Sequence, residues 1–337
     1  MTPQDPTWAE LEATGSTPPG AGEAPAPTPR VDSKRPAKTD TLASRTMATV
    51  TRKDIQWVWR NRLAAGKPCI IAGDPGEGKS TLLCDIAAKI SRGAKLPDDD
   101  EARPPRDVLI ISAEDDPEDT VWDRLAASNA DMDRIFWVDG VSRDSDGKAQ
   151  GFFSVIDDLD RLEGTLTEPG RDFAMVILDP FDAYLGGEVD THRSASVRSA
   201  TGPFQKVLER THVCGACVLH LNKSSGTKAS YRIQGNIAFF ATTRQALLVS
   251  HEPDGEDDQV RHVVGFTNSN GPKAAGLSFR IDAMTGHFRW KSGTTTMTDG
   301  QLLREPTRNE EEDSDTASAA EVLTDLLANG PVEVELA

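Results

Sequence analysis

Hydrophobic and polar positions follow two different patterns along the chain. From about residue 66, short and almost continuously apolar runs are separated by stretches with helical spacing. The apolar runs predict strands at 68–72, 108–112, 135–138, 174–179 and 214–219. The spacing between them predicts helices at 80–90, 118–127, 153–166 and 194–210. Because apolar strands that alternate with helices are typical of a parallel sheet covered on both faces, we predict an α/β fold.

The pattern changes in the last third of the chain. Shorter apolar runs there predict strands at 246–250, 262–267, 277–281 and 287–290, separated by turns such as Ser269-Asn270-Gly271-Pro272. We expect these strands to be antiparallel additions to one edge of the sheet.

The two ends of the chain have another composition. Residues 1–46 hold eight prolines in their first forty positions, which predicts a disordered tail. One large α/β domain is expected at 47–295, followed by an acidic linker at 296–316. Residues 317–337 predict a C-terminal helix at 317–328, which we expect to be the first helix of a truncated module.

Composition and charge limit where the protein is expected to be located and what its surface can bind. The 337 residues are 37% hydrophobic and carry a net charge of −17. No apolar run approaches the roughly 18 to 20 residues that span a bilayer, and the start of the chain is unlike a signal peptide, so we expect a cytoplasmic protein without membrane contact. The acidity argues against a surface coated with basic residues for nucleic acid, but not against a local groove or a ring channel.

The chain has four cysteines, Cys69, Cys84, Cys214 and Cys217. Cys214-Gly-Ala-Cys217 matches C-x-x-C, for which a redox or metal role is one interpretation. The other is that these are ordinary buried residues. We favour burial, since no second pair completes a zinc site and positions i and i+3 of a strand face opposite sides.

A phosphate-binding motif follows the first predicted strand. Residues 73–80 fit G-x-x-x-x-G-K-[ST] at every fixed position, between an apolar strand and a helix. Glycines let such a loop curl around phosphate oxygens, and the start of the helix adds partial positive charge. Lys79 would reach the β- and γ-phosphates of ATP, and Ser80 would hold Mg²⁺. The predicted nucleotide-binding residues are Gly73, Asp74, Pro75, Gly76, Glu77, Gly78, Lys79, Ser80 and Thr81.

Three more polar residues come at the ends of predicted strands. Asp179 ends an apolar run and is predicted to hold Mg²⁺, with turn capping before Pro180 as the alternative. Glu114 follows Ser112-Ala and is predicted to orient the attacking water, with Asp115 in support, although an acidic cluster here also favours a helix start. His220 could sense the γ-phosphate or be a satisfied core histidine.

The stretch after His220 offers cations. Lys223, Lys228, Tyr231 and Arg232 lie in one loop, where phosphates could meet the cations while a base stacks on tyrosine. An ordinary charged loop is the alternative. Arg232 or Arg244 could complete a neighbouring subunit's site, a role that accelerates hydrolysis by about 10³–10⁵-fold in other enzymes; a plain surface arginine is the default for either.

Taken together, these motifs resemble the RecA-like ATPases of the RepA type, which include plasmid and phage hexameric replicative helicases. The resemblance covers about residues 50–292 and rests on 73–80, Ser112-Ala-Glu114-Asp115, Ile177-Leu-Asp179 and His220-Leu-Asn-Lys223. It implies a RecA-like P-loop fold, ATP and Mg²⁺ as cofactors, a hexameric ring, and catalytic roles for Lys79, Glu114, His220 and Arg244. It also implies that the loop at 224–234 contacts single-stranded DNA.

Two departures from the family leave its activity open. The strand before Asn270-Gly271 lacks the lysine or arginine that related helicases carry, and the C-terminal piece is short. We therefore predict ATP hydrolysis with DNA helicase or translocase action. The main alternative is a nucleotide-switched regulator or DNA-binding ATPase without unwinding, and a small-molecule kinase ranks lower.

Overall fold

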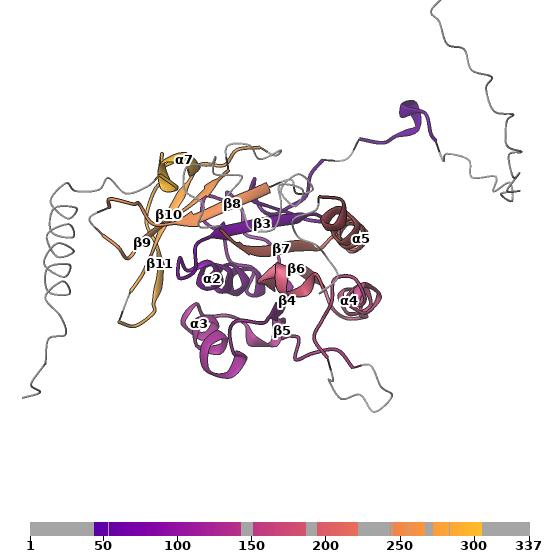
Figure 1. Ribbon diagram of the computed structural model, residues 1–337, viewed down its shortest axis with the longest axis horizontal. Coiled ribbons are helices and arrows are strands. Elements are labelled where there is room, and N and C mark those ends of the chain that lie inside the picture. Colours follow the sequence, from indigo (N-terminus) through magenta and orange to yellow (C-terminus); the bar gives the residue numbers. More distant parts are fainter. Residues whose placement is uncertain are drawn as a thin grey trace, which may run out of the picture. The chain divides into compact units, whose positions relative to one another are not determined.

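A computed structural model of the chain describes residues 44–52, 54–142, 151–186, 194–221, 243, 245–255, 257–266, 272–282 and 284–304. The chain divides into two units, residues 1–53 and 54–337. In the first unit, a 3₁₀ turn spans Met47–Thr49 and is capped by the Thr46 side chain. The second unit holds the sheet and the other helices (Figure 1).

The core of the second unit is a sheet with the strand order β11-β10-β9-β8-β3-β7-β6-β4-β5. The strands that pair in parallel are β3 (Pro68–Gly73), β4 (Asp107–Ser112), β5 (Ile135–Trp137), β6 (Phe173–Asp179), β7 (Cys214–His220) and β8 (Gln245–Ser250). The strands β9 (Val260–Gly265), β10 (Leu277–Ile281) and β11 (Phe288–Trp290) extend the sheet in antiparallel pairing. The predicted α/β class and mainly parallel sheet are confirmed.

Helices cover both faces of the parallel strands, as Figure 1 shows. On β3, Ile70 and Ala72 belong to one core cluster, and Cys69 and Ile71 belong to the other. The first cluster includes residues of α4 (Leu159–Leu166) and α5 (Ser194–Thr211), and the second includes residues of α2 (Lys79–Ser91) and α3 (Trp122–Ala127). Successive side chains of a strand face opposite sides, and here both sides are covered. Positions facing either side are therefore apolar, which explains the continuous apolar runs of the sequence.

The strand β8 corrects one prediction. We expected residues 246–250 to join the sheet as an antiparallel addition, but β8 pairs in parallel with β3, from Cys69↔Gln245 to Ala72↔Leu248. Its burial explains the difference: all six residues of β8 are buried, and the other central strands have at most one residue that is not buried, whereas β10 and β11 are partly exposed. The antiparallel extension therefore begins at β9.

The predicted helix at 153–166 is wrong in its first half, because α4 begins only at Leu159. Phe153 and Val155 are buried in the core, and side chains two positions apart do not share a helical face. Ser154 and Asp158 also bond locally, since the Asp158 carboxylate accepts from the Ser154 backbone N–H across 3.0 Å. Such bonds offer the backbone an alternative to helical pairing.

Several short elements complete the unit. Strands β1 (Trp57–Trp59) and β2 (Leu63–Ala64) form an antiparallel pair, and the buried Trp59 packs edge-on against Trp290. A π-helical turn at Pro117–Val121 precedes α3, and 3₁₀ turns span Met132–Arg134 and Phe181–Tyr184. A short helix, α7 (Asp299–Leu302), lies where the acidic linker was expected to start, and its Leu302 is buried.

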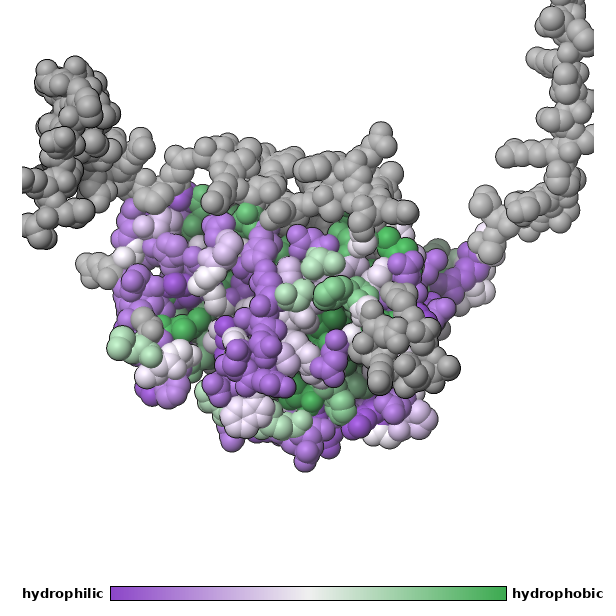
Figure 2. Space-filling model, turned by 60° about the horizontal axis from the view of Figure 1, so that its bottom comes forward, coloured by the Kyte–Doolittle hydropathy of each residue, from purple (hydrophilic) through white to green (hydrophobic). Residues whose placement is uncertain are grey.

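The outer surface is mixed in polarity. Figure 2 shows one face on which hydrophilic side chains predominate among the described residues and hydrophobic ones form smaller areas between them. Among the described residues, no helix has the length and apolar character needed to cross a bilayer.

Candidate active site

The predicted phosphate-binding loop connects β3 to α2, and its glycines adopt conformations that other residues avoid. Gly76 and Gly78 both have φ of +81°, and Gly78 caps the start of α2. At Gly73 the constraint is space, because a Cβ there would lie 2.2 Å from the carbonyl oxygen of Val249. The loop therefore has the strand–turn–helix form that a phosphate-binding motif requires.

Sheet pairing brings the other predicted residues to the same edge. Gly73 at the end of β3 pairs with His220 at the end of β7. Asp179 at the end of β6 pairs with Ser112 at the end of β4, and Glu114 follows two residues later. Because parallel strands present their carboxyl ends at one edge, residues distant in sequence meet beside the loop.

Lys79 lies folded over the loop that precedes it. Its Nζ donates to the carbonyl oxygens of Gly73, at 3.0 Å, and Asp74, at 2.9 Å. Burial lowers the pKa of Lys79, and the carboxylates of Asp179, Glu114, Glu77 and Asp74 oppose that effect. The ammonium group is thus held at the loop by carbonyl oxygens and surrounded by negative charge.

Ser80 and Asp179 form a pair with the properties of a Mg²⁺ site. The Ser80 hydroxyl donates to Asp179 Oδ2 across 2.6 Å, and Asp179 is buried. Burial raises the pKa of Asp179 to about 6, while the Ser80 hydrogen bond lowers it. The other carboxylate oxygen, Oδ1, is buried without a hydrogen-bond partner among the described residues. Since an unpaired buried carboxylate oxygen is costly and Mg²⁺ prefers oxygen ligands, this pair fits Mg²⁺ held partly through water.

Glu114 and His220 are directly hydrogen-bonded. His220 Nε2 lies 2.8 Å from Glu114 Oε1, and His220 Nδ1 lies 3.4 Å from Lys79 Nζ. Because a lysine ammonium group can only donate, the Nδ1 that faces it acts as acceptor and the ring proton lies on Nε2. His220 then donates to Glu114, whose side chain is 44% exposed and able to meet water.

The cavity beside the loop has a volume of about 380 Å³ and includes two residues that sequence reasoning missed, Arg124 and Ile281. Arg124 Nη1 donates to Asp115 Oδ2 across 2.5 Å, so the carboxylate after Glu114 holds an arginine at the cavity. Ile281, at the end of β10, packs so closely that a Cβ on Gly78 would lie 2.3 Å from its Cδ1. The sequence held no local signal for either residue.

A family model described as an AAA domain matches residues 33–226, more than half of the chain. This chain belongs to the AAA domain family. The AAA part of the predicted resemblance is confirmed by this match. The match covers the phosphate-binding loop and the strand ends that carry Glu114, Asp179 and His220.

Other comparisons add little to the family assignment. No curated protein matches the chain significantly. The solved structure of another protein's ATPase domain is similar with a TM-score of 0.48 and 12% identity, over 66% of this chain and 84% of that one.

The cysteines of this AAA domain are part of its core. All four are free and buried, as predicted, and burial raises the pKa of the Cys84 thiol to about 12. Cys214 and Cys217 belong to different core clusters, on opposite faces of β7. Cys214 instead lies beside Cys69 of the neighbouring strand, with 3.9 Å between the sulfur atoms.

Some predicted site residues lie outside the described part of the chain. They are Lys223, Lys228, Tyr231, Arg232 and Arg244. Their roles remain predictions.

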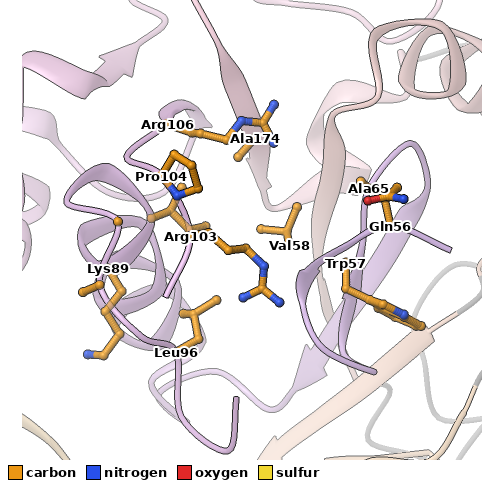
Figure 3. Close-up of a pocket in the computed structure, with 13 residues that line it drawn as sticks. Gln56, Trp57, Val58, Ala65, Lys89, Leu96, Arg103, Pro104, Arg106 and Ala174 are labelled. Atoms are coloured by element: carbon orange, nitrogen blue, oxygen red, sulfur yellow. The ribbon is translucent and has the colours of Figure 1, made fainter. Parts of the chain in front are cut away.

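A second cavity of about 350 Å³ lies at the other end of the strands (Figure 3). Trp57 and Val58 of β1 line it together with Arg103, Arg106 and Ala174, which lie near the starts of β4 and β6. Trp57 and Val58 therefore pack at this cavity. In Figure 3 the guanidinium group of Arg103 lies between Leu96 and Trp57, and it is paired with Asp99 at 2.6 Å.

Proposed function

We propose that this AAA domain hydrolyses ATP with Mg²⁺ at the cavity beside residues 73–80. The observation that carries the proposal is that five side chains meet at one loop. Lys79 and Ser80 begin α2, and Glu114, Asp179 and His220 come from three strand ends. A P-loop by itself binds nucleotide, whereas hydrolysis also needs an acid on the metal side and a residue that orients water.

Each residue has a distinct role in this proposal. The loop backbone and Lys79 bind the β- and γ-phosphates, and Ser80 and Asp179 hold Mg²⁺. Bound Mg²⁺ would neutralise charge that develops on the phosphate oxygens. Glu114 orients the attacking water and accepts its proton, a role supported by its exposure and by its position at the strand end next to Asp179.

His220 connects the phosphate end of the site to the water end. Its Nδ1 faces Lys79 and its Nε2 faces Glu114, so a shift of Lys79 towards bound phosphate would change the hydrogen bonds on both sides of the ring. We assign His220 the role of γ-phosphate sensor on this basis.

We further propose a biological role in DNA unwinding or translocation by a cytoplasmic phage or mobile-element replication protein. In this proposal the chain works as a hexameric ring, with Arg244 reaching the neighbour's nucleotide and Lys223, Lys228, Tyr231 and Arg232 contacting single-stranded DNA. The net charge of −17 favours the alternative, a nucleotide-switched regulatory or DNA-binding ATPase without unwinding activity.

ATPase assays test both levels of the proposal. Lys79→Ala is expected to abolish turnover, and retained turnover would refute the site. Single-stranded DNA is expected to stimulate the wild-type enzyme, and a forked duplex should be unwound. ATP hydrolysis without either effect would leave the regulatory alternative. The molecular mass of the protein in solution with ATP tests the proposed ring. A mass equal to that of one chain would exclude it.

A further inference from the structure

The phosphate-binding loop contains a buried carboxylate that the hydrolytic roles do not use. Glu77 occupies a position where the motif accepts any residue, yet its side chain is only 7% exposed. Its Oε2 accepts a hydrogen bond from the backbone N–H of His251 at 2.8 Å, and its Oε1 accepts one from His251 Nδ1 at 2.7 Å. Arg261 Nε lies 3.1 Å from Oε2.

The partners of Glu77 come from the two strands where the parallel sheet meets its antiparallel extension. His251 directly follows β8, and Arg261 lies in β9, which pairs with β8. The side chains of Glu77 and Arg261 are both largely buried, and the His251 ring is about half exposed. The loop is therefore attached to the sheet extension through a carboxylate, an arginine and a histidine.

A carboxylate in this loop poses an electrostatic problem. Triphosphate is strongly anionic, and a nearby negative charge in a partly buried site repels it. The charge of Glu77 is felt at Lys79, where it is one of the four carboxylates that oppose the lowered pKa. An unpaired carboxylate here would weaken phosphate binding, whereas one matched by Arg261 contributes little net charge.

We propose that Glu77, Arg261 and His251 form a charge-balanced lock that lets the loop bind phosphate. Arg261 neutralises the Glu77 carboxylate, and the two hydrogen bonds from His251 hold the loop at the end of β8. Glu77, Arg261 and His251 are thus positioning residues for nucleotide, acting through the loop. This inference rests on the proposed nucleotide binding.

A charge-removal cycle on the full chain tests the lock. The readout is the dissociation constant for the Mg²⁺ complex of a non-hydrolysable ATP analogue, measured at low salt. Arg261→Ala leaves Glu77 unpaired and is expected to weaken binding by about tenfold or more. Glu77→Gln alone keeps an acceptor for His251 and should stay within about threefold of wild type. The double variant is expected to return to within about threefold as well.

Two further variants make the cycle decisive. Arg261→Lys keeps the charge if Arg261→Ala fails to fold, and it is expected to bind within about threefold of wild type. Arg280→Ala removes an exposed arginine of β10 that pairs with Asp257 and not with Glu77, and it should bind as wild type does. Thermal unfolding of each variant separates loss of fold from loss of binding.

The possible outcomes separate a failure of the proposed lock from a failure of the proposed nucleotide binding. Rescue of Arg261→Ala by Glu77→Gln supports charge balance, because a purely structural role predicts that the two losses add. Unchanged binding in Arg261→Ala, or a double variant no better than Arg261→Ala, overturns the lock while nucleotide binding stands. A wild-type chain that does not bind the analogue overturns both.

Discussion

The Nε2 atom of His220 lies 2.8 Å from Glu114 Oε1, although 106 positions separate the two residues in the chain. The proposed water-orienting carboxylate is therefore held by the proposed phosphate sensor. Because the other ring nitrogen faces Lys79, a change at the phosphate side can reach Glu114 through one side chain.

Replacing His220 tests this connection. His220→Ala is expected to lower kcat by about a hundredfold or more, because Glu114 loses the donor that orients it. The KM for MgATP should change little, since the loop and Lys79 remain. Steady-state kinetics with His287→Ala, which alters an exposed histidine, provide the control. A His220→Ala enzyme with wild-type kcat would remove the residue from the mechanism.

The raised pKa of Asp179 predicts how metal-free stability depends on pH. Its pKa is about 6 in the folded protein against 3.8 as the reference for an exposed aspartate, so the folded state binds the proton more tightly. The contribution of Asp179 to the free energy of unfolding is therefore fully present below pH 4 and is lost as the pH rises through 6. Asp179→Asn should then raise the free energy of unfolding at pH 8 by on the order of 2 kcal/mol in EDTA.

Denaturant unfolding of both proteins at pH 4 and pH 8 measures this difference, which should nearly vanish at pH 4. Mg²⁺ at pH 8 is expected to stabilise the wild type but not Asp179→Asn. A wild type that is the more stable protein at pH 8 without metal would contradict the prediction.

The glycines of the loop offer a matched pair. Gly76 and Gly78 share a φ of +81°, but a Cβ on Gly76 meets nothing within 4 Å, whereas one on Gly78 would lie 2.3 Å from Ile281 Cδ1. Gly76→Ala is expected to cost about 1 kcal/mol of unfolding free energy from backbone strain alone. Gly78→Ala should cost about 1–3 kcal/mol more, because Ile281 must move. If denaturant unfolding gave the same loss of unfolding free energy for both variants, Ile281 would move aside without a measurable energetic cost.

Arg124 is expected to contribute to nucleotide binding from within the same subunit. Arg124→Ala removes a cation at the cavity and frees the Asp115 carboxylate, so the KM for MgATP should rise about tenfold. Arg210→Ala, which breaks an exposed ion pair with Glu163 on the other face of the sheet, should leave the KM unchanged. An unchanged KM in Arg124→Ala would place the arginine outside the binding site.

Sequence reasoning succeeded where local chemistry and a simple sheet rule suffice. The ends of β3, β4, β6 and β7 were predicted within one residue, and parallel pairing then puts Glu114, Asp179 and His220 beside the loop. The helix at 153–166 failed because Phe153 and Val155 are apolar residues that fill the core from irregular backbone. Hydrophobic spacing alone does not distinguish apolar residues on a buried helix from apolar residues that reach the core from irregular backbone.

By itself, the sequence determined the α/β pattern and the phosphate-binding loop, because glycine conformations, strand ends and helix starts depend on neighbouring residues. Only the tertiary structure decided that β8 pairs in parallel with β3, that Arg124 turns towards the cavity, and that Glu77 contacts Arg261 and His251. These are contacts between distant segments, with 174 positions between Glu77 and His251. The physical reason is that their energies depend on burial and charge in three dimensions, which the order of residues along the chain does not carry.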